Sequence, residues 1–141
     1  MATIKAYTDL QQSKKLAEIL PIESADMWWS RCTITDFGDG VLKVSYAIEP
    51  CNISQFRNTR EDVPCWSLAS LLDILPKNEG IDCSISFGYY NGKGEYIEKW
   101  LCAFEKEGET TDDFIIETID GDNPIDACVA MIEKLNELKM L

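Results

Sequence analysis

Four leucines in the middle of the chain recur at the spacing of one face of an α-helix. They are Leu68, Leu71, Leu72 and Leu75, at positions i, i+3, i+4 and i+7. Pro64 precedes this run and Pro76 follows it, as expected of residues that bound a helix. The run carries no charge before Asp73, so we expect a short, largely apolar helix that other elements cover on more than one side.

Two further helices are predicted towards the ends of the chain. Residues 8–11 have the form of a capping box, so a helix should begin near Asp9. Near the other end, Asn123 supplies a cap and Pro124 a first-turn proline. The apolar stripe of that last helix consists of Ile125, Cys128, Val129, Ile132, Leu135 and Leu138. We expect this stripe and the leucine stripe to pack on the same face of a sheet and to touch each other, with Leu72 buried.

Alternating apolar and polar residues predict the strands. The segments with this pattern, or with a high content of aromatic and β-branched residues, are 27–35, 41–48, 83–89, 96–104 and 114–119. The polar stretch 49–63 is predicted to be an exposed loop. The sequence therefore predicts an α+β fold: one domain over residues 1–141, with a mostly antiparallel sheet of about five strands and about three helices packed mainly on one face.

Composition indicates a soluble protein of the cytoplasm. The chain is 45% hydrophobic, and no apolar run approaches the roughly 20 residues of a membrane helix. The first residues lack the apolar segment of a secretory signal. Six cysteines are spread along the chain without a C-x-x-C pair, and histidine is absent. We therefore expect reduced thiols that pack as small apolar groups, and neither a metal ion nor a cofactor.

Negative charge is concentrated in the second half of the chain. The net charge is −12, and within residues 105–126 nine acids face only one base, Lys106. Such a segment repels nucleic acid and anionic membranes and attracts a basic protein. The residues predicted to form this acidic partner surface are Glu105, Glu107, Glu109, Asp112, Asp113 and Glu117.

Aromatic residues suggest an alternative function, the binding of a small ligand between sheet and helix. Adjacent residues of a strand point to opposite faces, so either Trp28 or Trp29 would be exposed unless helices cover both rings. The candidate binding residues are Trp28, Trp29, Tyr90 and Trp100 for stacking, with Arg57 and Arg60 for an anionic group. Both alternatives for the two tryptophans stay open at this point.

Enzymatic chemistry finds little support in the sequence. Without histidine, the chain contains neither a Cys–His nor a Ser–His–Asp arrangement, although a Ser–Lys or paired-carboxylate site stays open. Residues 36–38 spell Asp-Phe-Gly, but the other kinase motifs are missing, so a hairpin turn is the better interpretation. Residues 120–123 lack the glycine position and the closing glutamate of a calcium loop, and helix capping explains them. We expect no catalytic residue.

Three segments of the chain carry a resemblance to other proteins. They are residues 20–27, residues 64–76 with the pattern P-x-W-S-L-x-x-L-L-x-x-L-P, and residues 123–132, which open with N-P-x-D-A. The chain resembles a group of small proteins of unknown function from gut anaerobic bacteria and their phages and mobile elements. The resemblance implies a bacterial or phage accessory protein, and it carries over no activity or ligand.

Overall fold

The computed structural model of the chain describes residues 5–35, 42–46, 51–52, 62–77, 80–106 and 115–141. For residues 31–35, 42–46, 51–52 and 115–118 the description covers the backbone alone. The helices are α1 (Leu10–Ile19), η1 (Ile22–Ser24, a 3₁₀ turn), α2 (Leu68–Ile74) and α3 (Pro124–Glu137). The strands are β1 (Met27–Trp29), β2 (Arg31–Thr35), β3 (Leu42–Tyr46), β4 (Cys51–Asn52), β5 (Val63–Cys65), β6 (Ile81–Tyr90), β7 (Tyr96–Lys106) and β8 (Ile115–Gly121).

The predicted α+β class is confirmed. All strand pairs among the described residues are antiparallel, and they form the sheets β4-β1-β5, β2-β3 and β6-β7-β8. The predicted strand 27–35 divides into β1 and β2, which join different sheets. Most of the predicted loop 49–63 lies outside the described residues, and Cys51–Asn52 within it forms β4.

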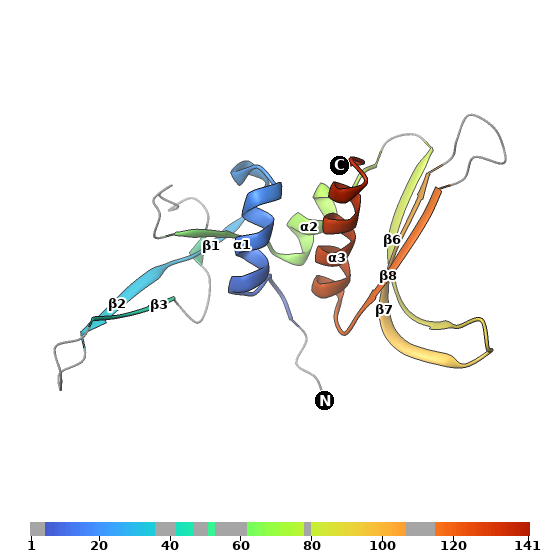
Figure 1. Cartoon of the computed structure of the whole chain (residues 1–141), viewed down its shortest axis with the longest axis horizontal. Coiled ribbons are helices and arrows are strands. Elements are labelled where there is room, and N and C mark those ends of the chain that lie inside the picture. Colours follow the sequence, from blue (N-terminus) through green and yellow to red (C-terminus); the bar gives the residue numbers. More distant parts are fainter. Residues whose placement is uncertain (1–4, 36–41, 47–50, 53–61, 78–79, 107–114) are drawn as a thin grey trace.

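The helices form a layer between the β4-β1-β5 sheet and the β6-β7-β8 sheet (Figure 1). α1 packs against β5 and α3, and α3 packs against β7 and β8. α2 packs against α3, so the predicted contact between the leucine helix and the last helix is confirmed. All three helices lie on one side of the β6-β7-β8 sheet, with α3 next to the strands (Figure 1).

One apolar cluster joins the helices to β7. Its fully buried members include Leu16 of α1, Leu71 of α2 and Phe104 of β7, together with residues of α3. The prediction that Leu72 is buried is wrong, because 37% of this residue is exposed. Successive helical residues are about 100° apart, so turning Leu71 into the core points Leu72 away from it. Leu138, predicted in the last stripe, is the residue after α3 and is 41% exposed.

Helix α1 begins one residue later than the capping-box pattern predicts. Asp9 is its N-cap: the Asp9 carboxylate accepts from the Gln12 N–H at 2.8 Å, and the Gln12 side chain accepts from the Asp9 N–H at 3.1 Å. Thr8 is buried, and its hydroxyl instead lies 2.7 Å from the Ser13 hydroxyl and accepts from the Trp66 N–H at 3.1 Å. The expected cap residue therefore joins α1 to the segment before α2.

The β6–β7 hairpin extends beyond β8. β8 pairs with β7 only from Lys106 to Trp100, so the tip of the hairpin is two-stranded. Residues 91–94, between the predicted strands 83–89 and 96–104, form the turn of the hairpin, and the Asn91 side chain accepts from the N–H groups of Lys93 and Glu95. The register shifts between Phe87 and Tyr89, where Gly88 adopts a φ of +79°, a conformation that glycine adopts without strain.

Candidate functional site

The most distinctive surface of the described chain is the face of the β6-β7-β8 sheet that points away from α3. Strand alternation separates the two faces: Cys102 and Phe104 are buried under the helix, whereas Asp82, Ser84 and Ser86 of the neighbouring strand are exposed. No described helix lies on this side (Figure 1). We call it the helix-free face and define it by Asp82, Ser84, Ser86, Tyr89, Leu101, Ala103, Glu105 and Asp120.

Carboxylates lie at both ends of the helix-free face. Asp82 and Glu105 are directly opposite each other on β6 and β7, and Asp120 pairs with Leu101 near the other end. Like charges directly opposite in a strand pair are destabilising. Within the described residues, the ion pairs involve neither Asp82 nor Glu105. The fold therefore keeps two carboxylates side by side without a described cation between them.

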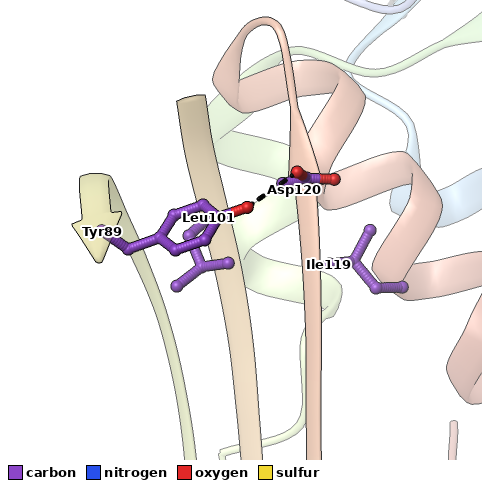
Figure 2. A pocket seen from close by; sticks show the side chains of 4 residues that line it. All are labelled: Tyr89, Leu101, Ile119 and Asp120. Carbon is purple, nitrogen blue, oxygen red and sulfur yellow. Dashed lines mark hydrogen bonds between the residues drawn. The ribbon is translucent and has the colours of Figure 1, made fainter. Parts of the chain in front are cut away.

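Small and apolar residues occupy the space between these carboxylates. The centre of the face is flat, because the side chains there, those of Ser84, Ser86 and Ala103, are small. A shallow depression of about 480 Å³ adjoins it, lined by Tyr89, Leu101, Ile119 and Asp120 (Figure 2). A flat surface with one shallow depression differs from the concave, enclosed sites that bind small molecules.

Tyr89 and Asp120 form a hydrogen bond across the strands. In Figure 2 the Tyr89 side chain extends from β6 across β7, and its hydroxyl donates to Asp120 on β8 at 3.0 Å. This hydrogen bond to a carboxylate raises the pKa of Tyr89, because the ionised phenolate would lose it. The register shift at Gly88 turns Tyr89 towards the helix-free face. Phe87 lies before the shift, and its ring contacts Trp100 instead.

The predicted acidic surface is only partly described. Glu105 lies on the helix-free face, and Glu117 is the register partner of Phe104 on β8. The other predicted members, Glu107, Glu109, Asp112 and Asp113, lie outside the described residues. Sequence reasoning left Asp82 and Asp120 out of the acidic surface, and both lie just outside the predicted strands 83–89 and 114–119. Their strand pairing with Glu105 and Leu101 could not be seen without the register.

The structure places the four predicted aromatic residues in two different sheets. Trp28 and Trp29 are 9% and 7% exposed, so the alternative in which both rings are covered is the one observed. The Trp29 ring nitrogen donates to the Thr8 carbonyl at 3.3 Å. Tyr90 and Trp100 belong to a different sheet, β6-β7-β8. Arg57 and Arg60, predicted as anion-binding residues, lie outside the described residues.

A second, polar depression of about 370 Å³ lies between α1 and α3. Lys5 donates to Asp9 at 2.9 Å and to Asp126 at 3.0 Å, and Gln12 donates to Asp126 at 2.8 Å. Partial burial disfavours the charged Asp9 carboxylate, but hydrogen bonds from Gln12 and Lys5 outweigh it and hold the pKa of Asp9 below its ordinary value. These polar groups hydrogen-bond to one another, so the cluster holds the N-terminal segment and α1 against α3.

Three of the described thiols, those of Cys65, Cys83 and Cys102, have raised pKa values. The neighbouring Cys128 thiol and burial raise the pKa of Cys102 to about 12, and the Cys83 thiol acts in the opposite direction. Burial also raises the pKa of Cys65. Thiols with raised pKa values are poor nucleophiles and poor metal ligands. In the described part of the chain, no three Cys, Asp or Glu side chains are arranged to hold a metal ion.

Comparisons with known proteins gave no match: no protein-family model, no curated protein and no solved structure is similar to the chain. Among the described residues, no helix has the length and apolar character needed to cross a membrane.

Proposed function

We propose that this chain is a non-enzymatic binding protein of the bacterial or phage-infected cytoplasm that docks on a basic protein partner through its helix-free face. Inhibitors, adaptors and immunity-type proteins act in this way. The partner would place lysine or arginine side chains against Asp82, Glu105 and Asp120, and its apolar side chains against Leu101 and Tyr89.

The Asp82–Glu105 pair is the observation that carries this proposal. Two carboxylates directly opposite each other weaken the strand pair that holds them. A cationic partner removes that repulsion on binding, so the arrangement favours the bound state over the free state. The uneven net charge of −12 adds a long-range attraction that steers a basic protein towards this half of the chain.

The test compares two variants that remove the same amount of charge. The first neutralises the helix-free face with Asp82→Asn, Glu105→Gln and Asp120→Asn. The matched control carries Glu18→Gln, Glu23→Gln and Glu137→Gln, three exposed carboxylates on or next to the helices. Proteins retained by the immobilised wild-type chain at low salt are identified, purified and titrated against all three forms by calorimetry.

We expect a basic partner whose affinity falls about tenfold or more with the neutralised face and stays near wild type with the control. Raising the salt concentration should weaken wild-type binding, because salt screens charges at an exposed interface. A purified partner that binds both variants equally, or the retention of no salt-sensitive protein, would contradict the proposal.

A further inference from the structure

The depression beside the helix-free face contains a carboxylate that no described cation neutralises. Asp120 is exposed, and its side chain has one described hydrogen-bond partner, the Tyr89 hydroxyl at 3.0 Å. Among the described residues, no ion pair involves Asp120. Leu101 lines the same depression of about 480 Å³ (Figure 2). A negative charge therefore lies next to an apolar wall, which is the combination that a cationic side chain with an apolar stem complements.

A register shift in the β6–β7 hairpin places Tyr89 at this depression. Between the pairs formed by Phe87 and Tyr89, the single residue Gly88 of β6 lies opposite two residues of β7. Without the shift, Phe87 and Tyr89 would point to the same face, because side chains alternate along a strand. Bulges of this kind re-aim side chains, often next to functional sites. Here the bulge directs the Tyr89 side chain towards Asp120.

The Tyr89–Asp120 hydrogen bond places two acceptors side by side. The Tyr89 hydroxyl gives its proton to Asp120, so the phenol oxygen can accept from another donor, and the carboxylate keeps free acceptor sites. A guanidinium presents several N–H donors in a planar fork and stacks on aromatic rings, whereas an ammonium is a compact, strongly hydrated charge. Adjacent acceptors beside an aromatic ring therefore fit arginine better than lysine.

The lining of the depression fits the remainder of an arginine side chain. Leu101 is the register partner of Asp120, so it lies beside the path that the Tyr89 side chain takes across β7 (Figure 2). Leu101 and Ile119 supply apolar groups against which the methylene stem can pack while the charged head stays near water. Arginine is also enriched among the residues that dominate the binding energy of protein interfaces.

We infer that this depression is a binding site for an arginine side chain. Asp120 and Tyr89 contact the guanidinium, and Leu101 contacts the stem. The inference rests on the proposed function, in which that arginine belongs to the basic partner, and it names the side chain that the partner presents. Tyr89 makes the site selective for arginine, because its ring and its hydroxyl oxygen favour a planar guanidinium over an ammonium.

The test uses two small probes in place of the partner, N-acetyl-arginine amide and N-acetyl-lysine amide. Each probe carries one positive charge, so the two differ only in the side chain that bears it. Each is titrated into the full chain labelled with ¹⁵N, and sodium chloride is lowered in step to hold the ionic strength constant. Amide shifts in NMR spectra report where a probe binds, and nuclear Overhauser effects report which protons it contacts.

We expect the arginine probe to shift the amides of Tyr89, Leu101 and Asp120 in a saturable way. Its affinity should exceed that of the lysine probe by about threefold or more. Overhauser effects should join the arginine side chain to the Tyr89 ring. Equal affinities of the two probes, shifts that do not saturate, or larger shifts elsewhere on the chain would overturn the inference. These measurements need only the wild-type chain, so they do not depend on the folding of a variant.

Two variants with matched controls then test the named residues. Tyr89→Phe keeps the ring but removes the hydroxyl, so the ratio of arginine to lysine affinity should fall towards one. Asp120→Asn should weaken both probes by about threefold or more. The controls Tyr90→Phe and Glu98→Gln change an exposed tyrosine and an exposed carboxylate of the same hairpin, and they should change neither affinity. The ¹⁵N spectrum checks the fold, and a folded Tyr89→Phe variant with an unchanged ratio would overturn the inference.

The arginine site and the proposed function fail in different experiments. Selective arginine binding at the depression, in a chain that retains no salt-sensitive basic protein, would support the site and contradict the proposed function. A basic partner that needs the carboxylates of the helix-free face, but binds the Tyr89→Phe variant as tightly as the wild type, would support the proposed function and overturn the arginine site.

Discussion

Side chains near the start of α2 make the hydrogen bonds that hold distant segments together. The Trp66 ring nitrogen donates to the Ser24 hydroxyl at 3.0 Å, and the Ser67 N–H donates to the Asp26 carboxylate at 2.9 Å. Ser67 also caps α2, accepting from the Ser70 N–H. Two of the segments that carry the sequence resemblance, 20–27 and 64–76, therefore contact each other. These hydrogen bonds and the cap give Ser24, Asp26, Trp66 and Ser67 structural roles.

At Leu71 and Leu72, adjacent residues of one type should differ sharply in their effect on stability. Leu71 is fully buried, whereas Leu72 is 37% exposed. Leu71→Ala should lower the free energy of unfolding by about 2–5 kcal/mol, the range for truncating a buried leucine. Leu72→Ala should cost less, about 1 kcal/mol, because more than a third of Leu72 is already exposed to water. Denaturant unfolding of both variants gives the comparison, and equal losses would show that Leu72 is covered.

The Cys102 thiol should make the protein sensitive to alkaline pH. Its pKa is raised to about 12 in the folded chain from an ordinary value of 9.0. A raised folded-state pKa stabilises the fold fully below the ordinary value, and this stabilisation is lost as the pH rises from 9.0 through about 12. The denaturation midpoint should therefore fall over this range.

Cys102→Ala provides the control for this pH dependence. The variant loses stability at every pH because it leaves a cavity, but the part of the alkaline decline that comes from Cys102 should disappear. Unfolding of the wild type and the variant at matched pH values separates the two effects. Parallel declines in both proteins would assign the pH dependence to other groups.

At the scale of elements, local signals predicted most of the helices and the strands 83–89 and 96–104 of the β6–β7 hairpin. Asn123 caps α3 in the structure as its position before Pro124 predicts, and the Asn91 turn joins β6 to β7. Pairing between distant strands could not be predicted. The division of 27–35 between two sheets depends on β4 and β5, and the cover over Trp29 depends on the segment around Tyr7. The helix-free face was missed for the same reason, since it exists only through strand register.

The junction between β8 and α3 depends on a glycine. A Cβ atom added at Gly121 would lie 2.7 Å from the Ala127 backbone nitrogen, too close for the two elements to stay in place. Gly121→Ala should therefore lower the free energy of unfolding by about 1–3 kcal/mol. Gly92 in the hairpin turn has no heavy atom within 4 Å of such a Cβ. Gly92→Ala should change stability by less than about 0.5 kcal/mol, and equal effects would place β8 and α3 further apart.

At the scale of the whole molecule, the helices connect the β4-β1-β5 and β6-β7-β8 sheets, which do not pair with each other. α1 contacts β5 on one side and α3 on the other, and α3 contacts β7 and β8. The buried cluster is continuous across this layer, from Leu16 of α1 through Trp66 to Phe104 of β7. Lys5 and Gln12 also donate hydrogen bonds to Asp126, which joins the N-terminal segment and α1 to α3. A continuous core of this kind predicts that the two sheets unfold together.

Leu16→Ala tests this coupling, because Leu16 is fully buried where α1 faces the rest of the core. A chain of 141 residues with one core should unfold in a single cooperative step. The variant should then lower the opening free energy by the same amount, about 2–5 kcal/mol, at the most protected amides of β5 and of β7. Native-state hydrogen exchange in low denaturant measures both strands in one experiment. A loss confined to β5, with β7 unchanged, would show that the β6-β7-β8 sheet and α3 are a separate cooperative unit.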